Sequence, residues 1–355
     1  MAKRLIPALF TAIFLLPALT WAQKPTFTVG WSIYVGWDPY QYMAKAGLLR
    51  KWGDKYGVAI KLQRFDYAPS IDAFTSKNID ACTMTNMEAL DLPAASGVDT
   101  TAIIIGDYSN GNDALMARDA NTLNTLAGKK ILLVQKTVSE YLLERAFVLN
   151  GLENQARKAK LVNTSDGSIV AAFMNDPSQA AVVTWKPLVS QVQKMKGVNT
   201  LFDSSKIPGE ILDLLAVRTE VLNRPDGSGK NFAKAITGAW YEMMARMNAK
   251  DSDKALSAIA AVSEDTLESY KNQLSTTHMM YKPEEAAAMA SSAGIKDKMK
   301  LVRQFCFTHG LLGSGTKSPD DVAVQYPDKS VQGQSGRVRL RFDDDYMKLA
   351  AGGKL

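Results

Sequence analysis

Strand-like and helix-like segments alternate along this chain from about residue 26 onward. Runs rich in Val, Ile and Thr predict strands at 26–34, 58–65, 79–85 and 100–108. The segments between them predict helices at 39–57, 69–78 and 87–97. Regular alternation of strand and helix is typical of a mostly parallel sheet with helices on both faces.

The alternation then begins again, which indicates a second lobe. Strands are predicted at 130–134, 159–164, 179–185 and 198–203, with a helix ending at Asn150 and further helices at 165–176 and 186–197. Residues 207–222 predict a turn and a strand that returns to the first lobe, and the pattern from Asn231 to 312 is mainly helical.

The fold class that we expect is α/β, a bilobal clamshell of two doubly wound lobes with a helical C-terminal extension. The predicted parts are a signal peptide (1–22), the first part of lobe 1 (23–113), lobe 2 (114–218), the return of lobe 1 (219–312), and a C-terminal loop and short helix (313–355).

The N-terminus has the three-part layout of a cleavable secretory signal. Lys3 and Arg4 provide positive charge, an apolar run follows to Leu19, and small residues precede a cleavage point between Ala22 and Gln23. The run is shorter than the about 20 residues that span a bilayer, although a retained anchor is the alternative. We therefore expect export, and a periplasmic location in a bacterium with two membranes.

Composition narrows the function further. The chain has 355 residues with a formal net charge of +6, and its basic residues are scattered rather than clustered with aromatics, which argues against nucleic-acid binding. Cys82 and Cys306 lie far apart in the sequence, so an exported protein could pair them or keep them as buried thiols.

Sequence patterns typical of catalysis are missing. His278 and His309 have no partner at metal-ligand spacing, and no nucleophile elbow, phosphate loop or dinucleotide-binding glycine pattern is found. The acidic run at 343–345 predicts an exposed helix start. We therefore expect no enzyme activity, no metal and no cofactor.

Three segments carry a family resemblance: VGWSIYVGWDPYQYMAKAGLLRKWGDKYG, SKNIDACTMTNMEALDLPAASGVDTTAIII and LAGKKILLVQKTVSEYLLERAFVLNGL. They resemble the nitrate/sulfonate/taurine-type substrate-binding proteins of ABC transporters. LVRQFCFTHGLLG and VRLRFDDDYM resemble more narrowly the subgroup associated with urea carboxylase, of urea or guanidine type. The resemblance implies a monomeric binding protein that delivers a small molecule to an ABC permease and its ATPase at the inner membrane.

Ligands of open α/β sheets bind at the carboxyl ends of strands, and in a two-lobed protein these ends face one another. Applied to the predicted strands, this rule selects Ser32, Tyr34, Trp37, Asp38, Asn86, Glu88, Asp107, Ser139, Glu140, Trp185, Glu210 and Asp213 as ligand-binding candidates, with Thr85 and Asp113 beside them. Asp38 is also a candidate helix N-cap.

These candidates include several carboxylates and aromatic rings but no arginine. A planar cation needs such carboxylates and rings, whereas an oxyanion needs arginine or helix-start N–H groups. The bias favours a small NH-rich solute, cationic rather than anionic, although Lys136 and Lys186 could serve an anion.

Three alternatives stay open. The first is a sulfonate, taurine or nitrate binder of the same class. The second is an enzyme similar to a pyrimidine-precursor synthase, for which this chain lacks the cysteine cluster and suitable histidine. The third is a sensor that presents its ligand to a membrane receptor.

Overall fold

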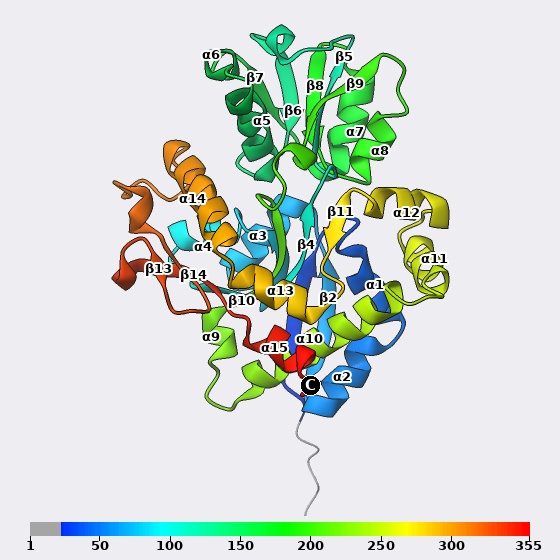
Figure 1. Cartoon of the computed structure of the whole chain (residues 1–355), viewed down its shortest axis with the longest axis vertical. Helices are drawn as coiled ribbons and strands as arrows, with labels where there is room; N and C mark the ends of the chain where they lie inside the picture. Colours follow the sequence, from blue (N-terminus) through cyan, green and yellow to red (C-terminus); the bar gives the residue numbers. More distant parts are fainter. Residues whose placement is uncertain (1–22) are drawn as a thin grey trace, which may run out of the picture.

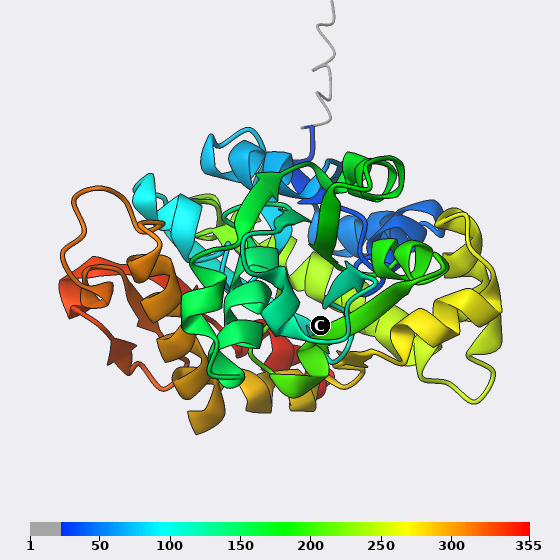
Figure 2. The same ribbon diagram turned by 90° about the horizontal axis from the view of Figure 1, so that it is seen from above.

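The protein consists of two lobes of unequal size. The structure, a computed structural model, describes residues 23–355, so the predicted signal peptide lies outside the described residues. Figure 1 shows the smaller lobe (green) above the larger lobe, which contains both the beginning and the end of the described chain. Seen from above, the smaller lobe lies over the middle of the larger one (Figure 2).

The larger lobe is built from two separate parts of the sequence. Its first part contains β1 (Thr26–Trp31), α1 (Asp38–Lys45), α2 (Leu48–Tyr56), β2 (Ala59–Arg64), α3 (Tyr67–Thr75), β3 (Ala81–Thr85), α4 (Asp91–Ala95) and β4 (Thr100–Ser109). Its second part contains β10 (Leu212–Arg218), α9 (Thr219–Leu222), α10 (Ser228–Met247), α11 (Asp253–Val262), α12 (Leu267–Leu274), β11 (Thr277–Met279), α13 (Pro283–Ala290), α14 (Ala293–Thr308), η3 (Pro319–Asp321), β12 (Ala323–Gln325), β13 (Val331–Gln332), η4 (Ser335–Arg337), β14 (Val338–Phe342) and α15 (Asp345–Ala351).

The smaller lobe is continuous in sequence. It contains β5 (Ala114–Arg118), η1 (Leu123–Leu126), β6 (Lys130–Leu133), α5 (Val138–Leu149), α6 (Glu153–Ala156), β7 (Lys160–Asn163), α7 (Asp166–Asn175), β8 (Gln179–Thr184), α8 (Leu188–Val192) and β9 (Val198–Asp203). The short turn η2 (Ser204–Lys206) leads back to the larger lobe.

Each lobe has one sheet. The larger sheet has nine strands in the order β13-β12-β14-β4-β10-β3-β1-β2, with β11 beside β4, and the smaller has the order β7-β6-β8-β5-β9. β1, β2 and β3 are parallel, whereas β10 runs antiparallel between β3 and β4. The mixed α/β architecture with two doubly wound lobes confirms the predicted fold class.

Helices cover both faces of the larger sheet, so its central strands are almost entirely buried. All five residues of β3 are buried. Helix α10 packs two aromatic rings against this lobe: Phe232 stacks on Phe27 at 4.6 Å and Trp240 stacks on Tyr40 at 4.8 Å between ring centroids. These stacks fix the turn after β1, which enters the cleft between the lobes.

The backbone conformation of one glycine divides a segment that was predicted as a single helix. The segment 39–57 forms α1 and α2 rather than a single helix, because Gly47 takes a left-handed conformation with φ of 74°. Similarly, the segment predicted as a helix at 87–97 begins with turns, and its helical part is only α4.

The lobe boundary predicted at 218 is wrong. β10 pairs with β3 and β4 in the larger sheet, so the smaller lobe ends with β9 and the chain crosses between lobes at 110–113 and 204–211. The segment 313–335, predicted as a surface loop, contributes β12 and β13 to the edge of the larger sheet. Short strands separated by turns give too weak a periodicity to be recognised in sequence.

Cys82 and Cys306 are free thiols buried in the larger lobe. Of the two alternatives that the sequence left open, a disulfide or two buried thiols, the structure has the buried thiols. Within residues 23–355, no helix combines the length and the apolar character needed to cross a membrane.

Candidate functional site

A small cavity lies where the two lobes meet. It is almost filled in this arrangement of the lobes, with a free volume of about 10 Å³, which is about the space of one water molecule. The residues that line it are Tyr34, Trp37, Tyr67, Thr85, Asp113, Val138, Trp185, Ile211 and Asp213. Val138 and Trp185 belong to the smaller lobe, and Asp113 and Ile211 lie on the two crossings. The cavity therefore exists only while the lobes are together.

Strand register brings Asp213, which lines the cavity, together with Asp107, which is not among the lining residues. β4 ends at the cleft and the antiparallel β10 begins there, so Asp107 and Asp213 are direct cross-strand partners. Asp213 is also opposite Thr85 on β3. The three side chains form a row across neighbouring strands, at the edge of the sheet that faces the smaller lobe.

The two carboxyl groups are incompletely bonded. Asp107 is fully buried, and its Oδ1 accepts a hydrogen bond from the Tyr34 hydroxyl at 2.8 Å. Across residues 23–355, no hydroxyl or N–H group donates to Asp107 Oδ2 or Asp213 Oδ2, although both atoms are buried. The two carboxyl groups can hydrogen-bond to one another when one of them is protonated, and buried polar atoms are normally satisfied in such ways.

Burial also alters the protonation of this group of acids. Loss of water raises the pKa of Asp107 to about 7, and burial together with the charge of Asp107 raises the pKa of Asp213 well above its usual value. Burial likewise raises the pKa of Asp113 to about 7, although the Ser109 hydroxyl donates to its carboxylate at 2.6 Å. Near neutral pH these acids therefore carry protons that a bound cation could displace.

Aromatic rings surround the acids. The rings of Tyr34 and Trp37 meet edge to face at 5.0 Å, Trp37 and Tyr67 at 5.7 Å, and Tyr67 and Trp185 edge to face at 5.4 Å. A turn after β1 positions the first two, because the Trp37 and Asp38 N–H groups both bond to the Tyr34 carbonyl. Aromatic faces near carboxylates attract and orient cations.

Trp185 joins the lobes directly. Its indole Nε1–H donates to the Ile33 carbonyl of the larger lobe at 2.8 Å, across the cleft. A second contact joins the lobes nearby, because Asp166 of α7 accepts the Tyr67 N–H of the larger lobe at 3.0 Å. These contacts define a closed arrangement of the two lobes.

Glu88 makes a third contact between the lobes. Its Oε2 accepts the Tyr67 hydroxyl at 2.8 Å and also the Thr85 hydroxyl, while its Oε1 accepts the Val138 N–H of the smaller lobe at 2.7 Å. Glu88 is 2% exposed, and this burial raises the pKa of its carboxyl group. The hydrogen bonds that it accepts oppose part of that increase.

Several sequence candidates lie outside the cavity lining. Asn86 bonds the Glu210 carbonyl and the Leu212 N–H, and thereby fixes one crossing to the sheet. Glu210 forms a two-bond ion pair with Arg145 at 2.8 and 3.0 Å and accepts the Tyr141 hydroxyl at 2.6 Å. Asn86 and Glu210 therefore hold the lobes and a crossing segment in place, and they do not form part of the cavity wall.

The other candidates outside the lining have local environments of their own. Asp38 lines a separate surface groove beside Arg64, and burial raises its pKa to about 8. It is the first residue of α1 rather than the N-cap, which is Trp37. Glu140 accepts the Lys136 N–H at 2.7 Å. The buried hydroxyls of Ser32 and Ser139 have no partner within the described chain.

Sequence reasoning missed Tyr67, which contacts both Trp37 and Trp185. It begins α3 directly after β2, and the carboxyl end of that predicted strand supplied no candidate. The same strand-end rule, applied to β2, would have selected it.

The basic side chains named as possible anion ligands do not enter the cavity lining. Lys136 lines an outer groove that it shares with Glu88 and Asp91. Lys186 is buried, and this burial lowers the pKa of its ammonium group. The negative charge of Asp203 acts in the opposite direction and raises that pKa. Among the nine lining residues of the cavity, none is a lysine or an arginine.

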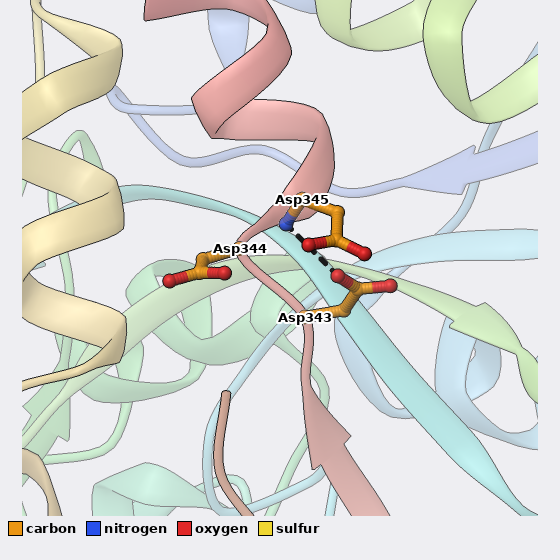
Figure 3. Close-up of side chains that lie close together, drawn as sticks. All are labelled: Asp343, Asp344 and Asp345. Carbon is orange, nitrogen blue, oxygen red and sulfur yellow. Dashed lines mark hydrogen bonds between the residues drawn. The ribbon is translucent and has the colours of Figure 1, made fainter. Parts of the chain in front are cut away.

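A second acidic group lies far from the cleft, at the start of α15. The carboxylate oxygens of Asp343, Asp344 and Asp345 can approach within 4.8 Å of one another. Figure 3 shows Asp344 directed away from the other two. Asp344 accepts the Ser291 hydroxyl at 2.7 Å and pairs with Lys348 at 2.8 Å, so its contacts are those of a helix start.

Comparison with solved structures places the architecture among known folds. The alkanesulfonate-binding protein SsuA from Xanthomonas axonopodis pv. citri, solved with bound MOPS, aligns with a TM-score of 0.67 at 14% identity, over 82% of this chain and 96% of that chain. The periplasmic aliphatic sulphonate binding protein SsuA from Escherichia coli aligns with a TM-score of 0.59 at 16% identity, over 80% of this chain and 87% of that chain.

The same fold also includes an enzyme. The desulfurization enzyme DSZB aligns with a TM-score of 0.52 at 14% identity, over 80% of this chain and 93% of that chain. No family model and no curated protein matches this sequence. The structural similarities establish that this chain has the fold of the periplasmic binding proteins.

Proposed function

We propose that this protein is the exported solute-binding component of an ABC importer and that it encloses a small NH-rich cation of the guanidinium type. The observation that carries the proposal is the pair of buried carboxyl groups of Asp107 and Asp213, of which Asp213 lines an aromatic-walled cavity and Asp107 lies beside it on the neighbouring strand. The named structural neighbours that bind solutes supply the transport class, and the lining residues supply the ligand chemistry.

A guanidinium ion matches the donors and acceptors of this site. Its N–H groups lie in one plane and can donate to two carboxylates at once, and its face can stack on an indole or phenol ring. Its positive charge also compensates acids that otherwise remain protonated or unpaired in a buried cavity. Neutral urea provides N–H donors but no charge, so we expect it to bind more weakly.

In this proposal, ligand contacts from both lobes stabilise the closed form, which then docks on a membrane permease driven by its ATPase. The contacts that Trp185 and Asp166 make across the cleft are of the kind that such closure requires. The predicted signal sequence at 1–22 supports a periplasmic location for this step.

A second candidate function is the binding of a sulfonate or another oxyanion, because the two solute-binding neighbours are named for sulfonates. One local feature favours it: the N-terminus of α5 reaches the cavity at Val138, and helix N-termini bind anions. The acidic lining argues against it.

Isothermal titration of the purified protein with guanidinium, urea, methanesulfonate, taurine and nitrate distinguishes the candidates. We expect guanidinium to bind at least about 100-fold more tightly than methanesulfonate, which corresponds to about 2.7 kcal/mol. Tighter binding of any sulfonate than of guanidinium would contradict the proposed ligand class.

A further inference from the structure

The N-terminus of α5 faces the cleft and is already satisfied from within the protein. α5 has 12 residues, and its N-cap Thr137 accepts the Ser139 N–H through its side chain. The first N–H of the helix, that of Val138, is left free by this cap and bonds the Glu88 carboxylate at 2.7 Å. A helix N-terminus is the part of a fold that most readily binds an oxyanion.

Glu88 is held in this position by two hydroxyl groups of its own lobe, which lies opposite α5. The hydroxyls of Tyr67 and Thr85 donate to one carboxylate oxygen, and the Val138 N–H donates to the other. Within residues 23–355, no lysine, arginine or histidine forms an ion pair with Glu88. The dipole of α5 is therefore the positive partner that this carboxylate has.

We infer that Glu88 determines the charge selectivity of the cleft, by occupying with its own carboxylate the helix N-terminus at which an anionic ligand would bind. This inference rests on the proposed solute-binding function and deepens it. An incoming sulfonate would have to displace a tethered anion and would be repelled by it. A cation meets neither obstacle, because its partners are Asp213 and Asp107.

The position of Glu88 between two spaces supports this role. The residue borders the outer groove, together with Asp91 and Lys136, whereas its three hydrogen-bond donors line the inner cavity. An anion entering from this groove would meet the Glu88 carboxylate before it reached the Val138 N–H.

The test is isothermal titration of methanesulfonate and of guanidinium into the wild-type protein and a Glu88→Gln variant. Glutamine keeps the shape and an acceptor oxygen for the Val138 N–H but removes the charge. We expect the variant to bind methanesulfonate at least tenfold more tightly than the wild type. The measurement is repeated in an Asp213→Asn background, because the remaining carboxylate also opposes an anion.

Glu144→Gln is the matched control. Glu144 lies on the same helix, pairs with His309 at 2.9 Å and is 36% exposed, so its removal changes the charge of α5 outside the cleft. We expect this variant to bind both ligands as the wild type does. A Glu88→Ala variant provides a second test if the glutamine variant does not fold.

The outcomes separate the two proposals. If guanidinium binds the wild type but no Glu88 variant gains methanesulfonate affinity in either background, Glu88 does not set selectivity, and the cation-binding function stands. If the wild type binds methanesulfonate more tightly than guanidinium, the cation-binding function fails as well. If the wild type binds neither ligand, a gain of methanesulfonate binding in the variant still supports the role of Glu88.

Discussion

Asp107 and Asp213 hold two carboxyl groups opposite one another on neighbouring strands, away from water. Burying an unpaired charge is costly, and a second acid alongside adds repulsion. The protein tolerates the pair because burial raises both pKa values, which favours the neutral acids in the empty site. A cation that entered would restore the charged forms.

The first prediction concerns the charge of Asp213. Asp213→Asn should weaken guanidinium binding by about 30-fold or more, since losing one partner of a buried charge pair typically costs about 2 kcal/mol or more. The melting temperature of the empty protein should stay equal or rise, because a buried repulsion is removed. Titration calorimetry and thermal unfolding measure the two effects.

Asp253→Asn is the control for this variant, because Asp253 lies on the surface with its side chain 63% exposed and pairs with Lys271. It should leave ligand affinity unchanged. Wild-type affinity in the Asp213 variant would remove this residue from the binding site.

The second prediction concerns pH. Asp107 and Asp113 have pKa values raised to about 7, so the folded protein holds protons that the unfolded chain has lost above about pH 4. Stability of the empty protein should therefore fall as pH rises from 5 to 8, because the acids ionise while buried. Thermal unfolding at a series of pH values tests this trend.

Guanidinium affinity should change in the opposite direction. If binding expels one proton, affinity rises by about tenfold per pH unit below pH 7 and levels off above it. Calorimetry in two buffers of different ionisation enthalpy counts the released protons. Binding that is independent of pH between 5.5 and 8 contradicts the displacement of protons by the ligand.

At the residue scale, the ends of the predicted strands selected several residues that line the cavity. Tyr34, Trp37, Trp185 and Asp213 line the cavity, because they follow or begin strands that reach the cleft. The opposition of Asp213 and Asp107 could not be predicted, since it depends on the antiparallel register of β10. Asn86 and Glu210 also lie at strand ends, but their side chains are bonded within the protein.

At the scale of secondary structure, α5 connects ligand chemistry to lobe closure. Its N-terminal N–H at Val138 bonds Glu88 of the other lobe, and its side chain Arg145 bonds Glu210 on the returning crossing. One helix thus contacts the larger lobe and a hinge segment at once. When the smaller lobe moves relative to the larger one, each of these contacts must either break or move together with the lobe.

The third prediction removes only the donor of the bond between the lobes. Val138→Pro should preserve α5, because proline is favoured in the first helical turn and Thr137 already has an extended backbone. Losing a hydrogen bond to a charged group costs about 1.5–3 kcal/mol, so the unliganded protein should open more often. Small-angle X-ray scattering should then show a larger radius of gyration.

Val138→Ala is the control, because it also removes the branched side chain but keeps the N–H group. Circular dichroism checks that both variants retain their helices. If the proline and alanine variants scatter alike, the bond to Glu88 does not hold the lobes together.

Helices and strands differ in how well the sequence predicted them. The alternation of strand and helix is confirmed through both lobes, since buried parallel strands are apolar runs of distinctive length. The break at Gly47 and the short strands β12 and β13 were missed. A left-handed residue within an amphipathic pattern changes no periodicity, and very short edge strands carry little pattern.

At the scale of the molecule, binding and release require the two lobes to separate and meet again. The two crossings at 110–113 and 204–211 are the places where this movement can occur. Segments of regular structure lie on both sides of each crossing, so we expect the lobes to move as rigid units.

The fourth prediction locks this movement. A Cβ atom placed on Gly167 would lie 3.5 Å from the Asp66 carboxyl carbon, across the cleft. The double variant Asp66→Cys with Gly167→Cys should form a disulfide that holds the lobes closed. The oxidised protein should neither take up nor release guanidinium within minutes, and dithiothreitol should restore exchange.

The single variant Asp66→Cys controls for the loss of the carboxylate, and the native Cys82 and Cys306 are buried and free, so they do not compete for oxidation. Ligand exchange at equal rates in oxidised and reduced protein would show that the lobes need not open.

The larger lobe is formed by two separate parts of the sequence, and this arrangement affects how the chain folds. β10 lies between β3 and β4, yet the whole smaller lobe, residues 114–203, is synthesised before it. Until β10 has been synthesised, β3 and β4 each have an edge with unpaired backbone N–H and C=O groups, which can pair with strands of other chains. We therefore expect folding to be slow in the larger lobe and quick in the smaller one, whose five strands all pair with one another within 114–203. A truncation after 211 should yield a well-formed small lobe attached to an aggregating remnant.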